Sequence, residues 1–409
     1  MRLKVSSSKP LLLIFPFNLL SHYLRCLMLA KYLASYFEIR FAYSQPYSGF
    51  ISEEGFETFE CLSLDAKKVM EAVKMFDFSW VNDEELENIF NSQLGIIKQL
   101  KPIVVLGDTS PSLKMAAEKA GVHFIALMNG YMSKYYAFSR PLSRTHPVYP
   151  ILKLFPKIIL DALTKKGEAI TMTKVHSPFK SIRQKYKLSE KRSYLDELEG
   201  DVNLLCDLDE LFPQRNLPAS YQFISPLFYD PPKQLTGLSE KLDKTKKTIF
   251  VSMGSTGNWE KLIFLNDEYF TRYNLVTAGD TGYILSGSHI IRTGFGNFHE
   301  LFPYTDLVIC HGGNGTIYQS LFYGIPVLCK TSHFEQEWNV AALERMGVGK
   351  SLDGIKNISA HITLIEKWID KKNTSLYTMY DKRMSEERKK LDNIIKEIAV
   401  NILTAGVAK

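Results

Sequence analysis

Residues 311–339 read HGGNGTIYQSLFYGIPVLCKTSHFEQEWN, and this stretch decides the fold that the sequence predicts. The apolar run from Asp306 to Cys310 predicts a strand that leads into the glycines, an amphipathic helix follows, and Gly324-Ile325-Pro326 begins a further strand. Glycines allow a close backbone approach, and a helix N-terminus presents unpaired N–H groups to an anion. A histidine precedes the turn, and the polar pair Glu335-Gln336 is expected at the end of the next strand. Together these features indicate a nucleotide-sugar site.

Glycine-rich turns between strand and helix also occur for steric reasons alone, so an ordinary α/β turn is the alternative. The order of the whole stretch is more specific, because HGGxGT is followed by a helix, GxP and EQxxN. This composite resembles the donor-binding signature of family 1 glycosyltransferases of the GT-B fold, which include UDP-glycosyltransferases and macrolide-type bacterial enzymes. The resemblance is strong over residues 302–349, fair over 11–128 and faint over 131–201. It implies an α/β protein with two doubly wound, Rossmann-like domains that face each other across a cleft.

The composition is that of a globular protein with more than one domain. The chain has 409 residues, 45% of them hydrophobic and 23% charged, which suits two domains of about 200 residues each. Five scattered cysteines without CxxC spacing argue against a disulfide framework or zinc site and favour a reducing compartment. We interpret the apolar run Leu11–Phe15 as a buried strand and not as a signal peptide. A cytoplasmic location is therefore expected.

Strands and helices alternate along both halves of the chain, which predicts parallel sheets. The domains that we expect are an acceptor-binding domain (1–230), a linker (231–247), a nucleotide-sugar-binding domain (248–379) and a helical tail (380–409). Predicted strands lie at residues 10–17, 38–43, 103–106, 123–128, 202–205, 248–252, 274–277, 284–286, 307–310 and 327–329, and helices at 21–36 and 111–120. Residues 131–200 lose this alternation and are expected to face the substrate.

The catalytic base that we predict is His22, which lies where the first strand passes into the first helix. The family resemblance implies a histidine base here, although Ser21 replaces the usual glycine and could cap the helix. Asp108 follows the buried strand at 103–106, and the resemblance implies that it orients the histidine. The alternative is that Asp108 only caps the helix that begins near Pro111.

The resemblance implies that the second domain binds the donor and stabilises the diphosphate. His311 and the turn residues Gly313, Asn314, Gly315 and Thr316 would bind the diphosphate, together with Ser255 and Thr256 of VSMGST. Glu335 and Gln336 would bind the sugar hydroxyls, and Phe295 or Phe298 would stack on the base, unless they are core residues. Gln319 replaces a glutamate that usually binds the ribose, which leaves UDP and dTDP open. No DxD motif accompanies the site, so no metal or other cofactor is expected.

The sequence gives weaker indications of the acceptor-binding site. Four aromatic residues are predicted to line it, although packing explains them equally well: Tyr131, Tyr135, Tyr136 and Phe138. Residues 134–192 carry fourteen Lys or Arg against three acids. A solvated helical face explains this excess, and docking to an anionic membrane is the sharper alternative, with a basic amphipathic helix at 148–163. No nucleic-acid-binding motif accompanies these basic residues, so nucleic-acid binding is not expected.

We therefore predict an inverting, metal-independent glycosyltransferase that moves a sugar from a UDP- or dTDP-sugar to a hydroxyl of a small, fairly hydrophobic acceptor. Two alternatives stay open. The first is a membrane-associated glycosyltransferase with a lipid or anionic acceptor at the inner face of a membrane, and the second is a catalytically idle nucleotide-sugar-binding protein.

Overall fold

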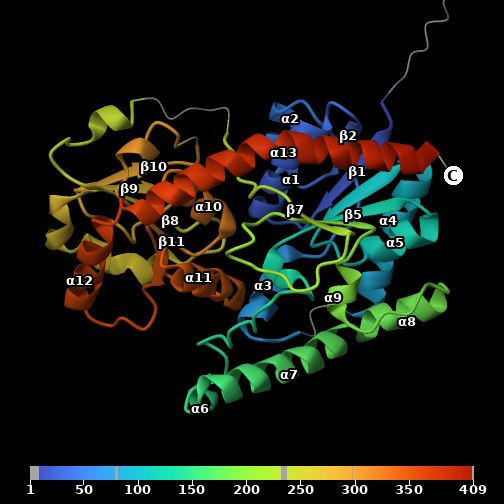
Figure 1. Ribbon diagram of the computed structural model, residues 1–409, viewed down its shortest axis with the longest axis horizontal. Helices are drawn as coiled ribbons and strands as arrows, with labels where there is room; N and C mark the ends of the chain where they lie inside the picture. The colour runs from blue at the N-terminus through green and yellow to red at the C-terminus, as the bar shows by residue number, and fades with distance from the viewer. Residues whose placement is uncertain (1–8, 79–81, 232–236, 297, 408–409) are drawn as a thin grey trace, which may run out of the picture. The chain divides into compact units, whose positions relative to one another are not determined.

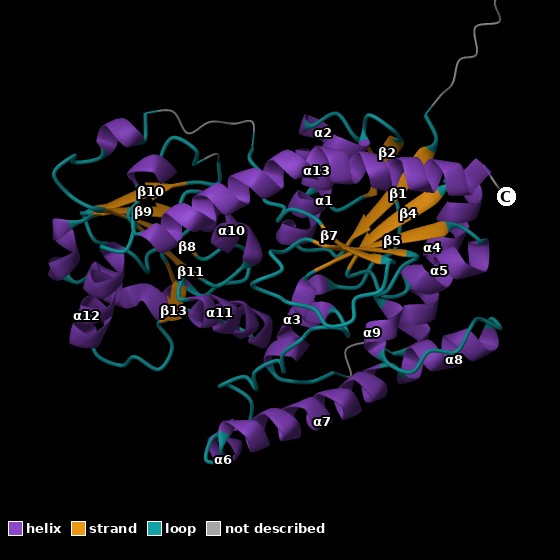
Figure 2. Cartoon of the chain, viewed as in Figure 1, coloured by secondary structure: helices purple, strands orange, loops and turns teal. Residues whose placement is uncertain are grey.

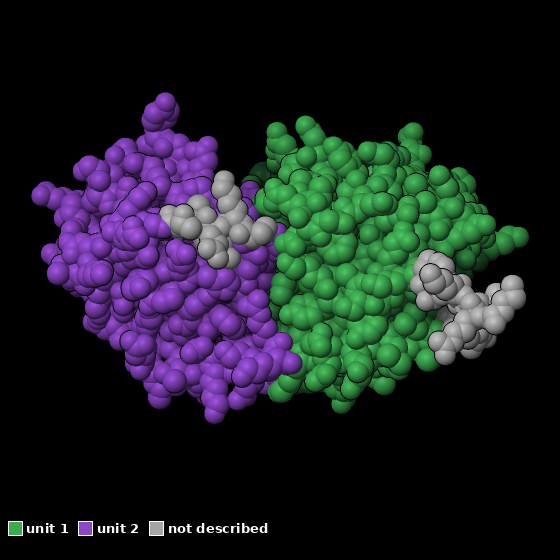
Figure 3. Space-filling model, turned by 90° about the horizontal axis from the view of Figure 1, so that it is seen from above, with its two compact units in different colours: residues 1–140, 152–227, 390–409 green, residues 141–151, 228–389 purple. Residues whose placement is uncertain are grey.

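The computed structural model describes residues 9–78, 82–231, 237–296 and 298–407. The chain divides into two compact units, which Figure 3 colours separately. Unit 1 comprises residues 1–140, 152–227 and 390–409, and unit 2 comprises residues 141–151 and 228–389. The boundary at 227/228 lies close to the expected one at 230. The assignment of residues 141–151 to unit 2 was not anticipated, and residues 232–236 of the expected linker lie outside the described part of the chain.

Unit 1 is built on a parallel sheet with the strand order β3-β2-β1-β4-β5-β6-β7. The central strands are apolar and buried on both faces, as parallel strands covered by helices must be. The strands are β1 (Leu11–Pro16), β2 (Glu38–Ala42), β3 (Glu57–Phe59), β4 (Val104–Asp108), β5 (His123–Met128), β6 (Val202–Leu205) and β7 (Tyr221–Phe223). Figure 1 labels these elements.

The helices of unit 1 bury apolar faces at helical spacing. In α1 (Leu20–Leu33) the buried set includes Tyr23, Cys26, Leu27 and Ala30. Helix α4 (Asp83–Leu100) begins with an Asn82 side chain that accepts a hydrogen bond from the Glu85 backbone. The remaining helices are α2 (Ser48–Glu53), α3 (Ala66–Lys74), α5 (Leu113–Ala120), the short η1 (Gly130–Met132), α7 (Lys157–Val175), α8 (Ser177–Lys185) and α9 (Tyr194–Glu197).

Unit 2 contains a second parallel sheet, with the strand order β10-β9-β8-β11-β12-β13. Figure 2 shows helices packed around the sheet of each unit. The strands are β8 (Thr248–Ser252), β9 (Asn274–Ala278), β10 (Ile290–Thr293), β11 (Leu307–Cys310), β12 (Val327–Cys329) and β13 (Gly349–Ser351). The helices are α10 (Asn314–Phe322), α11 (Phe334–Met346), α12 (Ile358–Ile369), η2 (Ser239–Lys241), η3 (Trp259–Asn266), η4 (Glu268–Arg272) and η5 (Phe302–Tyr304).

The strand register of each sheet brings the loops that carry function to one edge. In unit 1, Pro16 lies opposite Asp108, and Asp108 lies opposite Leu127. In unit 2, Cys310 lies opposite both Ser252 and Cys329. Because the paired strands are parallel, the segments that follow them leave from the same edge of their own sheet.

Several element predictions need correction. The strand expected at 284–286 is a turn, because Gly282 adopts positive φ beside a fully exposed Tyr283, and the strand β10 follows it instead. Helix α1 is preceded by Leu19 without a side-chain cap, so Ser21 lies inside the helix. The helix expected at 148–163 is two helices, α6 (Tyr149–Leu152) and α7, since Pro156 interrupts the pattern.

The terminal helix is longer than predicted. Helix α13 runs from Ser375 to Val407, and its residues up to 389 belong to unit 2 whereas those from 390 belong to unit 1. In the described part of the chain, none of the helices combines the length and the apolar composition that crossing a membrane requires.

Candidate active site

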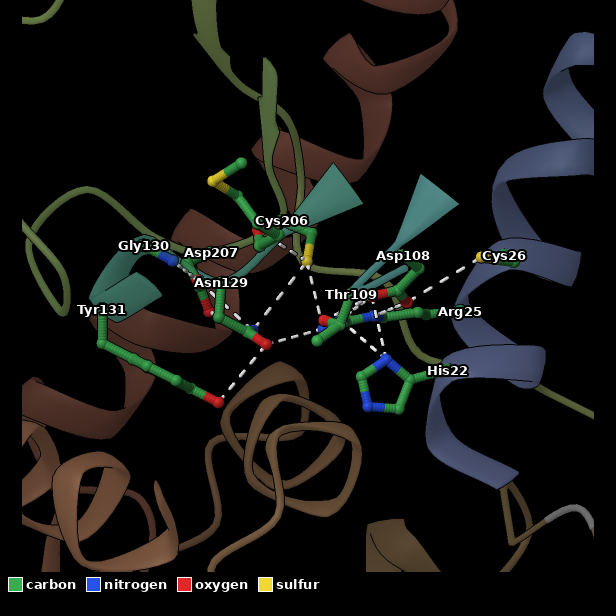
Figure 4. Close-up of polar contacts among 11 residues, drawn as sticks. His22, Arg25, Cys26, Asp108, Thr109, Asn129, Gly130, Tyr131, Cys206 and Asp207 are labelled. Carbon is green, nitrogen blue, oxygen red and sulfur yellow. Dashed lines mark hydrogen bonds and ion pairs between the residues drawn. The ribbon is translucent and has the colours of Figure 1, made fainter. Parts of the chain in front are cut away.

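His22 and Asp108 meet at the carboxyl edge of the sheet in unit 1. Asp108 is the last residue of β4, and His22 lies in the first turn of α1, which follows the neighbouring strand β1. The Nδ1 atom of His22 lies 2.9 Å from Oδ1 of Asp108 (Figure 4). The Asp108 side chain is 0% exposed, whereas that of His22 is 17% exposed. The pair therefore has a buried carboxylate and an imidazole that keeps access to the surroundings.

Arg25 is a third member of this group, and it lies one helical turn after His22 on α1. Its Nε and Nη2 atoms donate to the two oxygens of Asp108, a bidentate contact. Its Nη1 donates to Oδ1 of Asn129 over 2.7 Å, and its Nη2 lies 3.2 Å from His22 Nδ1. Asp108 is thus held by a guanidinium as well as by the imidazole.

Burial and neighbouring charges both shift the pKa values of the side chains in this group. Burial by itself raises the pKa of Asp108, but the charges and hydrogen bonds of Arg25 and His22 outweigh it and hold the pKa well below its usual range. Burial raises the pKa of the Cys206 thiol to about 12 and that of Cys26 well above its ordinary value. At neutral pH the group therefore consists of a carboxylate, a guanidinium and uncharged thiols.

Residues after β5 and β6 extend the network along the same edge. Asp207 accepts a hydrogen bond of 2.5 Å from the Gly130 backbone and lies 3.4 Å from the Asn129 amide. The Tyr131 hydroxyl lies 3.4 Å from Oδ1 of Asn129. Next to Asp108, Thr109 has φ of 53°, a conformation that is strained for a β-branched residue and that often accompanies functional sites.

The sequence analysis did not identify Arg25, Asn129 or Asp207. A signal for Arg25 was present, because residues three apart on a helix share a face and His22 was already singled out. Asn129 and Asp207 directly follow β5 and β6, in the same way that Asp108 ends β4. The other role considered for Asp108, a helix cap, is not seen: α5 begins after Ser112 without a side-chain cap.

In unit 2, His311 is enclosed by two glycines. It follows β11 directly, between Gly254 after β8 and Gly313 before α10. A Cβ atom on Gly254 would lie 2.6 Å from the His311 ring, and one on Gly313 would lie 2.4 Å from its Nε2. Gly254 also has a positive φ of 55°. The glycines of both loops are therefore needed to admit the imidazole.

Burial lowers the pKa of His311 to about 4, against a smaller opposing effect of the Ser252 backbone. The imidazole is consequently uncharged at neutral pH and has one N–H to donate. The turn continues into α10, whose N-cap is Gly313 in an extended conformation without a side-chain cap. The first helical residues, Asn314, Gly315 and Thr316, thus start a helix N-terminus, a place where anions bind favourably.

Gln336 links the loops of unit 2 to one another. Its Oε1 accepts a hydrogen bond of 2.6 Å from the Ser332 backbone, and its Nε2 donates to Oγ1 of Thr256 over 3.1 Å. One turn later on α11, the Asn339 amide donates to the Gly312 carbonyl over 2.9 Å. Gln336 is buried, so its amide organises the loop of Thr256 around the turn at His311.

The other predicted donor residues are distributed along the same elements. Ser255 is exposed, Thr256 and Gln319 are half-buried, and Glu335 is half-buried in the first turn of α11. The Glu335-Gln336 pair thus lies at a helix start that follows β12, not on the strand itself.

Phe298 does not present a stacking surface. Its ring is buried, with its centroid 4.8 Å from that of Phe250 on β8. Phe295 is half exposed. Of the two rings predicted to stack on the nucleotide base, Phe298 therefore belongs to the core. Stacking by Phe295 stays a prediction.

The four aromatic residues predicted for the acceptor side separate into two groups. The Tyr131 and Tyr136 rings pack against Phe212, at 5.3 and 6.0 Å between centroids, and Phe138 packs against Tyr136. Tyr135 packs instead against Tyr221 of the sheet. Through its hydroxyl, Tyr131 joins this cluster to the Asn129 network.

Among residues 9–78, 82–231, 237–296 and 298–407, no group of three or more His, Cys, Asp or Glu side chains is arranged to hold a metal ion.

Comparisons with known proteins extend over most of the chain, although no protein-family model matches it. The PGL/p-HBAD biosynthesis glycosyltransferase of Mycobacterium tuberculosis is 25% identical over 336 residues, which are 81% of this chain and 77% of that protein. The PGL/p-HBAD biosynthesis rhamnosyltransferase of Mycobacterium bovis is 24% identical over 271 residues, 64% of this chain and 59% of that protein. A relative named inactive, from the same species, is 25% identical over 241 residues, 58% of this chain and 64% of that protein.

The fold has close counterparts among solved structures. The glycosyltransferase VinC, in complex with dTDP, has a TM-score of 0.67 at 14% identity and covers 96% of this chain and 99% of its own. The spinosyn forosaminyltransferase SpnP has a TM-score of 0.66 at 15% identity and covers 96% of this chain and 100% of its own. These likenesses confirm the predicted GT-B fold.

Proposed function

We propose that this chain, a glycosyltransferase of the GT-B fold, transfers a sugar from a dTDP- or UDP-sugar to a hydroxyl of a hydrophobic acceptor, with inversion and without a metal. The observation that carries the proposal is the hydrogen bond between His22 and Asp108 at the carboxyl edge of the sheet in unit 1. A histidine oriented by a buried carboxylate is suited to remove a proton from an acceptor hydroxyl.

The contact with Asp108 supports one tautomer of His22. An ionised carboxylate only accepts hydrogen bonds, so we assign to Nδ1 the proton that it donates to Asp108. The other ring nitrogen, Nε2, is then unprotonated and lies on the side of the ring away from Asp108 (Figure 4). In the proposed reaction Nε2 takes the hydroxyl proton while the acceptor oxygen forms a bond to the anomeric carbon. The bond from that carbon to the diphosphate breaks on the opposite face, and its electron pair leaves with the diphosphate.

Arg25 has a positioning role in this proposal. Its bidentate contact with Asp108 holds the carboxylate in one orientation, and its charge keeps the carboxyl ionised. A protonated Asp108 could present a donor to Nδ1 and stabilise the wrong tautomer of His22. Arg25 therefore helps to keep Nε2 free to act as the base.

The donor diphosphate is assigned to the turn at His311 in unit 2. The uncharged imidazole would donate its N–H to a phosphate oxygen, and the backbone N–H groups at the start of α10 would bind the same anion. These dipoles are fixed in place by Gly254, Gly313 and Gln336 before the donor arrives. They compensate the charge that develops on the leaving group, which is the reason for proposing a metal-independent reaction.

The donor and acceptor classes rest on the relatives and on the aromatic cluster. One relative is named a rhamnosyltransferase, and VinC was solved with dTDP, so dTDP-sugars are the first donors to test. Tyr131 and Phe212 are buried in this cluster, so the half-buried Tyr136 and the exposed Phe138 are the rings proposed to meet the acceptor, and Tyr131 links them to the catalytic group through Asn129. These rings support a hydrophobic acceptor.

The test is sugar transfer by the full chain from dTDP- and UDP-hexoses to a panel of hydrophobic alcohols and phenols. We expect His22→Ala to lower kcat by about 10²- to 10⁴-fold, the usual contribution of a general base. Its affinity for dTDP, measured by calorimetry, should not change. Treatment with a chelator should leave the rate of the wild type unchanged.

A matched control is His123→Ala. His123 is the first residue of β5, at the opposite edge of the same sheet, and it should retain wild-type transfer. If His22→Ala transfers sugar as fast as the wild type, the assignment of the base is wrong. If chelation abolishes transfer, the metal-independent reaction is excluded.

A further inference from the structure

Helix α7 presents its apolar side chains to the outside. Of its nineteen residues, all within the described part of the chain, Val175 alone is buried. The exposed positions on the helix and in the segment before it include six large apolar side chains. We call these six residues of unit 1 the apolar strip: Leu154, Phe155, Ile158, Ile159, Leu163 and Ile170. Ile158 is 84% exposed, Leu154 79% and Ile170 62%.

The side of α7 that faces the protein carries both polar and apolar side chains. Its half-buried residues recur at helical spacing and include Leu160, Thr164 and Glu168. Near the end of the helix, Met172 and the buried Val175 pack against the hydrophobic core of unit 1. Glu168 forms an ion pair with Arg140, which also donates to the Ser133 carbonyl over 3.0 Å. The helix is therefore attached to unit 1 by an ion pair as well as by apolar packing near its end, and most of its large apolar side chains face outward, unlike those of an ordinary surface helix.

The C-terminal end of α7 is anchored in the same way. His176, which follows the helix, lies 2.7 Å from Oε1 of Glu197, and Arg183 donates to both oxygens of that glutamate, at 2.6 and 2.7 Å. Figure 1 shows α7 as an outlying helix, apart from the strands of unit 1. A firmly anchored helix with an apolar outer face has the form of an interaction surface.

Lysines accompany the apolar strip. Lys153, Lys157, Lys165, Lys166 and Lys174 are all exposed, and the acids in the same segment are Asp161, paired with Lys157 at 2.6 Å, and Glu168, paired with Arg140. On the helical wheel Lys165 lies about 20° from Ile158, and Lys166 lies between Ile158 and Ile170, so the lysines are interspersed with the apolar strip. Long lysine side chains can extend toward phosphate groups while apolar neighbours insert beside them.

We propose that the apolar strip and its lysines dock this chain on an anionic lipid bilayer, with α7 lying in the plane of the membrane interface. Nineteen helical residues give a contact about 28 Å long. The excess of positive charge selects an anionic bilayer over a neutral one and over a second copy of this equally basic chain. This inference does not depend on the proposed function, because docking requires neither donor nor acceptor.

The test is sedimentation of the full chain with vesicles at physiological salt. One set of vesicles is phosphatidylcholine alone, and the other contains phosphatidylcholine and phosphatidylglycerol in equal parts. We expect the wild type to bind the anionic vesicles at least tenfold more strongly than the neutral ones. Ile158→Asp/Ile170→Asp should abolish this binding, and Lys165→Glu/Lys166→Glu should weaken it by more than tenfold, at about fivefold for each lysine lost.

Matched controls separate the strip from general effects of the substitutions. Ile263 in η3 is 62% exposed, the same as Ile170, so Ile263→Asp places one charge on an equally exposed isoleucine outside the strip. Lys67→Glu/Lys68→Glu makes the matching charge change on α3. Both controls should bind anionic vesicles like the wild type. Circular dichroism of every variant shows whether the fold is retained.

Three outcomes would overturn the proposal. The first is a wild type that does not sediment with anionic vesicles, and the second is equal binding to both kinds of vesicle. The third is self-association of the wild type, measured by analytical ultracentrifugation, that Ile158→Asp/Ile170→Asp removes while vesicle binding persists. That result would make the apolar strip an interface between copies of the chain.

Discussion

Replacing Arg25 by methionine should destabilise unit 1, because it leaves a buried carboxylate without its main counterion. Asp108 is 0% exposed, and the Arg25 side chain is 11% exposed. Removing one partner of a buried ion pair typically costs about 3–5 kcal/mol. His22 and Thr109 would still contact Asp108, so we expect a loss toward the lower end, about 3 kcal/mol. In a unit of this size that corresponds to a fall in Tm of about 6–12 °C.

The loss should depend on pH in a defined direction. In the folded wild type the pKa of Asp108 lies below its unfolded value of about 3.9, so the stability that it contributes is present above about pH 5 and is lost as the pH falls. In Arg25→Met the Asp108 carboxyl has lost Arg25, the larger of the influences that lower its pKa. The difference in stability between variant and wild type should therefore be greatest at neutral pH and smaller near pH 3.

Thermal unfolding and hydrogen exchange together measure this effect. Exchange of the β4 amides reports on unit 1 directly, which matters because a chain of two units need not unfold in one step. The control is Arg40→Met on β2, whose ion pairs with Glu38 and Glu57 are exposed and should contribute at most about 1 kcal/mol. Arg25→Met/Asp108→Asn removes both buried charges, so it should recover part of the stability but not the transfer activity. The reasoning is refuted if Arg25→Met and Arg40→Met cost the same, or if the difference does not change with pH.

Three further predictions concern unit 2. Gly313→Ala should lower dTDP affinity at least tenfold, because its Cβ would lie 2.4 Å from His311 Nε2 and displace the ring; calorimetry would show this, and unchanged affinity would contradict it. His311 should not make dTDP affinity depend on pH between pH 6 and 8, because its pKa of about 4 keeps the imidazole uncharged there. A change in dTDP affinity within this range that is absent in His311→Asn would contradict this prediction. Phe298→Ala should cost about 3–5 kcal/mol of stability as a core truncation, whereas Phe295→Ala should retain stability and weaken dTDP binding; the reverse pattern would reassign the two rings.

Local patterns in the sequence predicted the strands well where apolar runs were long and bounded by turns. The strands at residues 123–128, 202–205 and 248–252 are found with the predicted limits. The strand expected at 284–286 is not formed. Gly279 and Gly282, which precede it, both adopt positive φ and allow a turn that the apolar residues alone do not reveal. Helix α7 was only partly anticipated, since most of its large apolar side chains face outward and do not mark a buried face.

The sequence by itself determined the α/β fold with two parallel sheets, the position of His311 in a glycine-rich turn, and the placement of His22 and Asp108 beyond or at the ends of strands, and the family resemblance implied the GT-B arrangement. The sheets and the loop positions follow from short-range rules, because the direction of parallel strands sends every such loop to one edge of its sheet. The tertiary structure alone decided that Arg25 shares Asp108 with His22, that the ring of Phe298 is buried, and that the apolar strip of α7 faces outward. Those results depend on which side chains from distant segments meet and on how much water they exclude, and no local pattern encodes that.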